Sequence, residues 1–238
     1  KNIKALSKHH PELTKMLEAL TVDEAKIKVV YSESGHPRLL FKKESGEEVY
    51  IHSAADPLNL ANQAVDLLGK MGKEGLIILF GFGLGYFSEE VFKVFEKGHI
   101  LLIYEATPAV FKIALTLRDY SELLESERVK VVLGEQVDSI PVIHSHYNHI
   151  LNGKFWVVKH QPSVKLNEEA YVKFFKKLEE EHMAMKSAVV TGMGLGNKFI
   201  DNFLENIPLV LRKPGVHKLK DIFQGRPAIV ISAGPSLD

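Results

Sequence analysis

The sequence contains no cysteine, has no excess of charge of either sign and lacks long apolar runs. Without cysteine the chain forms no disulfide, thiolate metal site or cysteine nucleophile, which suits a reducing cytoplasm. Its 30 Lys and Arg residues balance 30 Asp and Glu residues, which argues against electrostatic binding to nucleic acid. Apolar runs such as Leu76–Phe80 are far shorter than the roughly 20 residues of a membrane span. Hydrophobic residues still make up 45% of the 238 positions, enough to bury a sizeable core.

The first quarter of the chain has the pattern of a small antiparallel meander. Apolar residues alternate with polar ones near 27–31, 39–41 and 49–51, and turn residues separate these segments. A short helix is expected before them, over 9–19. Asp56-Pro57 predicts the start of another helix, with Asp56 as its cap and Pro57 in its first turn.

From Gly75 onward, buried strands alternate with helices. Strands are expected at 76–80, 100–104, 129–133 and 155–158, which predicts an α/β fold with a Rossmann-like parallel sheet. A mainly helical segment should follow from Asn167 to about Asn206, and beyond Pro208 a linker is expected at Pro214 and Gly215. Four regions result: an N-terminal helix and meander at 1–74, a Rossmann-like domain at 75–165, a helical linker segment at 166–224, and the first strand and loop of a truncated further domain at 225–238.

Three glycines, Gly81, Gly83 and Gly85, lie between an expected strand and an expected helix. Such a turn lets a ligand approach backbone N–H groups, and the helix N-terminus favours an anion. Glu105 follows at the tip of the next strand, where a carboxylate can accept ribose hydroxyls. The four residues predict a nucleotide-type pocket. The alternative is that the glycines serve only the geometry of the turn.

Other patterns carry weaker predictions. Gly192–Gly196 resembles a second glycine loop but stands in a helical context, so close helix packing is expected there. His144, His146 and His149 do not share one face with an acidic partner, and no metal site is predicted. A basic cluster is interpreted as a solvated linker face; it comprises Arg212, Lys213, Lys218, Lys220 and Arg226. No general base or other catalytic residue is identifiable.

The last residues carry a family resemblance. The stretch Gly225–Asp238, GRPAIVISAGPSLD, is an apolar strand that runs into a Gly-Pro-Ser loop. It resembles the start of the central domain of the motility accessory factor family, the flagellin glycosyltransferases of bacteria. The same opening resembles bacterial sialyltransferases and an archaeal pterin diphosphokinase family. His52–Pro57, HSAADP, is similar to an N-terminal motif of the family, and Asn202 and Asn206 are similar to its join with the central domain.

The resemblance implies transfer of a CMP-activated nonulosonic acid, of the pseudaminic, legionaminic or sialic acid type, to Ser or Thr of flagellin. The partners are then flagellin and a nucleotide sugar. Gly234, Pro235 and Ser236 would contact the nucleotide, Gly234 by close backbone approach and Ser236 through its hydroxyl. Sialyltransferases often have Asn where Ala233 stands. These 238 residues would be inactive by themselves, with an acceptor-binding or structural role.

Two alternatives remain. One is a methyltransferase-like domain that binds S-adenosylmethionine through Gly81–Gly85 and Glu105, although Phe80 stands where that family usually has an acidic residue and Tyr86 where the dinucleotide fingerprint has a third glycine. The other is a non-catalytic module that binds flagellin.

Overall fold

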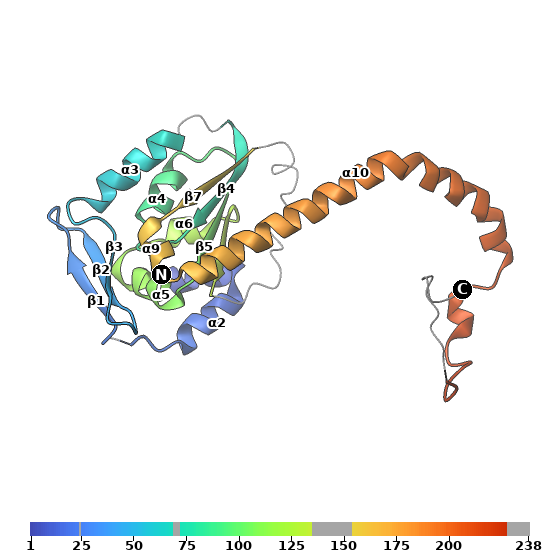
Figure 1. Ribbon diagram of the computed structural model, residues 1–238, viewed down its shortest axis with the longest axis horizontal. Coiled ribbons are helices and arrows are strands. Elements are labelled where there is room, and N and C mark those ends of the chain that lie inside the picture. The colour runs from blue at the N-terminus through green and yellow to red at the C-terminus, as the bar shows by residue number, and fades with distance from the viewer. Residues whose placement is uncertain (24, 69–71, 135–153, 228–238) are drawn as a thin grey trace. The chain divides into compact units, whose positions relative to one another are not determined.

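The computed structural model describes residues 1–23, 25–68, 72–134 and 154–227 (Figure 1). It confirms the predicted α/β class, with a parallel sheet of four strands, an antiparallel sheet of three and a long C-terminal helix. The chain divides into two compact units, residues 1–186 and 187–238. Both sheets belong to the first unit, and so do the glycine turn at Gly81–Gly85 and Glu105.

The chain begins with two short helices and the antiparallel meander. The elements are α1 (Asn2–His9), α2 (Pro11–Ala19), β1 (Ile27–Tyr31), β2 (Pro37–Lys42) and β3 (Glu48–Ile51). The strands pair in the order β1-β2-β3, as the alternation predicted. Helix α1 was not predicted. It forms because Ala5 and Leu6 enter the core and because the buried Asn2 side chain bonds the carbonyls of Leu115 and Arg118.

The parallel sheet has the strand order β6-β5-β4-β7. Its strands are β4 (Glu74–Phe80), β5 (Gly98–Glu105), β6 (Val129–Leu133) and β7 (Phe155–Lys159). After β4 the chain adds β5 and β6 on one side and then crosses to add β7 on the other. The winding therefore reverses between β4 and β7. This is the topological switch point, where open parallel sheets leave a crevice at the carboxyl ends of their strands.

Helices cover both faces of the parallel sheet. They are α3 (Pro57–Leu68), α4 (Tyr86–Lys93), α5 (Pro108–Leu117), α6 (Ser121–Glu125), α9 (Gln161–Leu166) and the start of α10 (Glu168–Arg212). Ile77 and Leu79 of β4 join a large core shared with the meander, whereas Leu76, Ile78 and Phe80 join a second core under α10. Because the meander and the parallel sheet share one core, the boundary expected at 74/75 separates two sheets and not two cores.

The start of helix α3 follows from its residues. The carboxylate of Asp56 accepts hydrogen bonds from the amides of Leu58 and Asn59 at 2.9 and 3.1 Å, so the predicted cap of α3 is present. Helix α3 packs against α4 (Figure 1).

The long helix departs from the prediction at its end. The helical segment was expected to end near Asn206, but α10 continues through Pro208 to Arg212, and the expected linker residues Pro214 and Gly215 follow its end. Proline removes one amide donor, but its fixed φ is helical, so the helix can continue at the cost of one bond. A short 3₁₀ helix, η1 (Val216–Leu219), follows. The strand expected after Pro227 lies outside the described residues.

Among the described helices, none combines the length and the apolar character that crossing a bilayer requires. Nor do the described ranges contain a group of three or more His, Asp or Glu side chains placed to hold a metal ion.

Candidate functional site

The glycine turn and Glu105 lie together, as the sequence predicts, but their contacts are internal. The Oε2 atom of Glu105 accepts hydrogen bonds from the amides of Phe82 and Gly83 at 2.9 and 3.1 Å. Its Oε1 atom accepts from the amide of Thr107 at 3.0 Å and from the Tyr171 hydroxyl at 3.1 Å. The side chain is 0% exposed. Burial raises the pKa of Glu105, whereas these donors favour its ionised form.

Both carboxylate oxygens of Glu105 are therefore engaged by the chain itself. The neighbouring amides of the turn are also bonded: Gly81 donates to the Tyr104 carbonyl at 2.8 Å and Gly85 to the Phe82 carbonyl at 2.9 Å. In this structure neither the carboxylate nor these amides are open to a ribose or a phosphate. Glu105 anchors the turn to β5 and, through Tyr171, to α10.

His52 follows β3 and supports the same turn from the meander side. Its Nε2 atom accepts a hydrogen bond from the Leu84 amide at 2.6 Å, and its carbonyl accepts one from Nε of Arg38 at 3.2 Å. His52 has φ +81°, in the left-handed region that non-glycine residues seldom adopt. Burial, then the positive charges of neighbours including Arg118, hold its pKa well below 6.5. The ring is therefore neutral at pH 7.

His160 comes directly after β7 and brings a second imidazole to the same place. Its ring lies 4.5 Å from the ring of His52, centroid to centroid, with 36° between the planes. Its Nδ1 atom is 2.8 Å from Oγ of the fully buried Ser163. Burial lowers the pKa of His160 to about 4, so this ring is also neutral at pH 7. A Cβ atom on Gly83 would come within 2.6 Å of His52 and 3.0 Å of His160, so only glycine fits under the two rings.

The two histidines line a cavity of about 230 Å³, which we call the switch-point cleft. It lies at the carboxyl ends of β4 and β7, where the winding of the sheet reverses. Most of its wall is apolar and comes from α3, α4 and the two strands. The lining residues are His52, Ser53, Pro57, Leu60, Ala61, Ala64, Leu79, Phe82, Tyr86, Phe87, Val158, Lys159, His160, Gln161 and Pro162.

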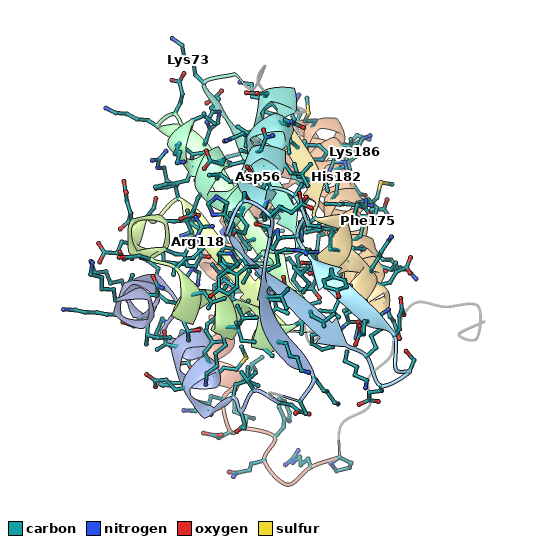
Figure 2. The ribbon with its side chains drawn as sticks, turned by 90° about the vertical axis from the view of Figure 1, so that its left-hand side faces the viewer. Asp56, Lys73, Arg118, Phe175, His182 and Lys186 are labelled. Atoms are coloured by element: carbon teal, nitrogen blue, oxygen red, sulfur yellow. The ribbon has the colours of Figure 1, made fainter. Side chains whose placement is uncertain are left out.

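Lys159 is the single charged residue in that lining, and its ammonium group is directed elsewhere. Its Nζ atom lies 5.3 Å from the ring centroid of Phe175, a residue of α10 labelled in Figure 2. Phe175 packs against the core on the opposite face of the sheet. Val158, the neighbour of Lys159 in β7, packs against the core on the cleft side. Successive strand residues point to opposite faces, so Lys159 contributes backbone to the cleft rather than charge.

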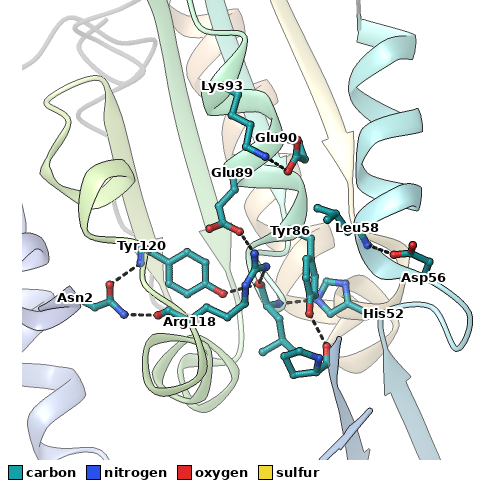
Figure 3. A network of polar contacts seen from close by, with 12 residues as sticks. Asn2, His52, Asp56, Leu58, Tyr86, Glu89, Glu90, Lys93, Arg118 and Tyr120 are labelled. Carbon is teal, nitrogen blue, oxygen red and sulfur yellow. Dashed lines mark hydrogen bonds and ion pairs between the residues drawn. The ribbon is translucent and has the colours of Figure 1, made fainter. Parts of the chain in front are cut away.

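Arg118 contacts two residues of α4 next to the cleft, Glu89 and Tyr86 (Figure 3). Its guanidinium forms an ion pair with Glu89 at 2.6 Å and lies 4.2 Å from the ring centroid of Tyr86. The Tyr86 hydroxyl in turn donates to the Pro37 carbonyl at 2.8 Å, and burial raises the pKa of Tyr86 to about 12. Because Glu89 neutralises it, Arg118 is a structural cation that ties α4 to the loop after α5.

The other predicted sites lie either outside the described residues or within α10. Gly234, Pro235 and Ser236 lie outside the described residues, as do His144, His146 and His149. Gly192–Gly196 lies within α10, as its helical context indicated. The role of His160 was missed, and His52 entered only as part of a motif. One signal was present for His160: it stands two residues past the strand expected at 155–158, where side chains lie near the carboxyl edge of the sheet.

No protein-family model matches the chain, and no curated protein matches it. Among solved structures, a protein-L-isoaspartate O-methyltransferase matches with 17% sequence identity and a TM-score of 0.29. The match covers 56% of this chain, and this chain spans 41% of that protein. A likeness of this size carries no conclusion about the activity of this chain, whose α/β fold is shown by its own strands and helices.

The main functional prediction is corrected by this finding. No family model and no curated protein supports a sugar transferase, and the structure that matches is described as a methyltransferase; transfer of a CMP-activated sugar to flagellin is withdrawn. Membership of the motility accessory factor family stays a prediction from Gly225–Asp238, most of which lies outside the described residues. The function below is argued from the site alone.

Proposed function

We propose that this protein binds a small, uncharged and mostly apolar molecule in the switch-point cleft. One observation carries the proposal: the cavity lies where parallel sheets bind their ligands, and no charged side chain is directed into it. Its volume of about 230 Å³ is below the roughly 300–1,000 Å³ of typical ligand pockets, so with its apolar wall it suits a compact molecule. A cytoplasmic location belongs to this proposal and rests on the absence of cysteine.

The absence of charge in the lining decides between classes of ligand. A buried ion without a counter-charge is strongly disfavoured. A nucleotide phosphate would meet two neutral imidazoles here, because Arg118 is paired with Glu89 and Lys159 points toward Phe175. An uncharged ligand incurs no such cost and gains from each apolar surface that it covers.

The methyltransferase-like alternative is the second candidate, favoured by a glycine turn and an acidic strand tip that do lie together. S-adenosylmethionine would need Glu105 to release the amides of Phe82 and Gly83 before its carboxylate could reach a ribose. Leaving two buried amides without acceptors costs about 2–6 kcal/mol. This reorganisation makes the neutral ligand the better-supported proposal.

The test is a titration with small neutral aromatic molecules, with S-adenosylmethionine as a parallel arm, followed by ligand-observed NMR and calorimetry. Ala64→Leu places a larger side chain in the cleft and should abolish binding of the neutral probe. Asn62→Leu makes a comparable change on the exposed side of α3, away from the cleft, and should leave binding unchanged. Equal affinity in both variants would overturn the proposal, and S-adenosylmethionine binding that Glu105→Gln abolishes would favour the alternative.

A further inference from the structure

The hydrogen bond to Leu84 fixes the position of the proton on the His52 ring. A backbone N–H group can only donate, so Nε2 of His52, at 2.6 Å from the Leu84 nitrogen, must carry a lone pair. In a neutral imidazole the other nitrogen then carries the proton. The ring therefore presents Nδ1–H as a donor of known identity.

No described residue of the chain accepts a hydrogen bond from this donor. Within the described part of the chain, Nδ1 of His52 has no hydrogen-bond partner, and it is not among the polar atoms that are sealed from solvent without one. The ring lines the switch-point cleft, and its other nitrogen faces Leu84. A polar donor at the edge of an apolar cavity is the arrangement that orients a ligand within it.

Each group packed against His52 limits what it can bind. His160 lies beside it and is neutral, and Tyr86 meets its ring edge to face at 4.9 Å between centroids. Arg38 bonds the His52 carbonyl, and Arg118 is held by Glu89. The apolar wall supplies no counter-charge, so it disfavours an ion of either sign.

We propose that the ligand of the switch-point cleft carries a carbonyl-type acceptor, and that Nδ1–H of His52 donates the hydrogen bond that recognises it. The inference rests on the function proposed above and narrows it to uncharged carbonyl compounds with an apolar body and no polar hydrogen, such as ketones, lactones or tertiary amides. A carbonyl oxygen is satisfied by a donor alone. A ligand hydroxyl brings a proton that needs its own acceptor in a mostly apolar wall.

The experiment uses three probes with one carbon skeleton: acetophenone, 1-phenylethanol and ethylbenzene. Acetophenone should bind about fivefold more tightly than ethylbenzene, the range of one neutral hydrogen bond. Two-bond ¹H–¹⁵N spectra of protein labelled at histidine report the tautomer directly. Without ligand they should show His52 protonated at Nδ1, and acetophenone, but not ethylbenzene, should shift that nitrogen.

His52→Phe keeps an aromatic ring and removes the donor. The variant should still bind ethylbenzene and should lose the fivefold preference for acetophenone. If the loss of the acceptor for Leu84 unfolds this variant, the ¹⁵N shift in the wild-type protein decides alone.

The outcomes separate the two proposals. Equal affinities of acetophenone and ethylbenzene, or an unchanged Nδ1 shift, would overturn the role of His52 and leave the cleft as a binding site. Tighter binding of 1-phenylethanol would overturn the carbonyl class. If none of the three probes binds, the function proposed for the cleft fails as well.

Discussion

Replacement of Glu105 tests whether its carboxylate serves the fold or a ligand. In Glu105→Ala the amides of Phe82 and Gly83 lose their shared acceptor in a fully buried position. Each orphaned amide costs about 1–3 kcal/mol, so the free energy of unfolding should fall by about 4 kcal/mol. A domain of this kind has about 5–15 kcal/mol in total, so the variant should fold but unfold at much lower denaturant.

Two milder variants divide this effect. Tyr171→Phe removes one donor to Glu105 and the acceptor of the Ala106 amide, and should cost about 2 kcal/mol. Glu105→Gln keeps an oxygen for the glycine turn but places an amide group against the Thr107 N–H, with a similar cost.

Urea unfolding followed by fluorescence of Trp156 is the assay, because this is the one tryptophan of the sequence and lies in β7. Glu44→Ala is the control, since this exposed residue has only an ion pair with Lys26 and should change stability by less than about 0.5 kcal/mol. A Glu105→Ala protein as stable as the wild type would refute the reasoning. Such a result would show that the fold does not need the Glu105 carboxylate, which would then be available for the ribose role that the sequence predicts.

Three further predictions concern stability. His160 takes up a proton near pH 6.5 in the unfolded chain but only near pH 4 in the folded protein. The free energy of unfolding should therefore fall by about 3 kcal/mol as the pH is lowered between these values, which urea midpoints at each pH would show. Gly81→Ala should cost about 3 kcal/mol, since φ is +93° and the new Cβ would lie 2.4 Å from Cβ of Ser163; Gly46→Ala, at φ +86° with open space around it, should cost about 1 kcal/mol in the same unfolding assay. Asn2→Ala removes three hydrogen bonds that hold α1, and should lower the unfolding free energy by about 3 kcal/mol and speed amide exchange in α1.

Much of the fold could be predicted because its signals are local. The meander follows from alternation within 27–51, and the start of α3 from Asp56 and Pro57. Helix α1 and the passage of α10 through Pro208 could not be predicted in this way. The first depends on burial of Asn2 against segments more than 100 residues away, and the second on a helix that tolerates one missing bond.

The candidate site shows the same division between local and distant information. The sequence placed Gly81–Gly85 beside Glu105 correctly, because consecutive parallel strands usually neighbour each other. It could not show on which side of β4 the later strand β7 would pair. That choice decides where the cleft lies, since β7 brings His160 to the edge of β4 that β5 does not occupy.

The same topology explains why the acidic strand tip became internal. On the β5 side, Glu105 is fully buried between the glycine turn and Tyr171 of α10, and four donors of the chain engage its two oxygens. On the β7 side the corresponding position is taken by neutral imidazoles, and a cavity remains. An ion at the tip of β5 is stabilised by bonds that the fold itself supplies, whereas the open edge carries no charge to attract one. This division underlies the proposal that the cleft recognises an uncharged molecule. The proton on Nδ1 of His52 is the group by which the cleft would distinguish a carbonyl compound from a plain hydrocarbon.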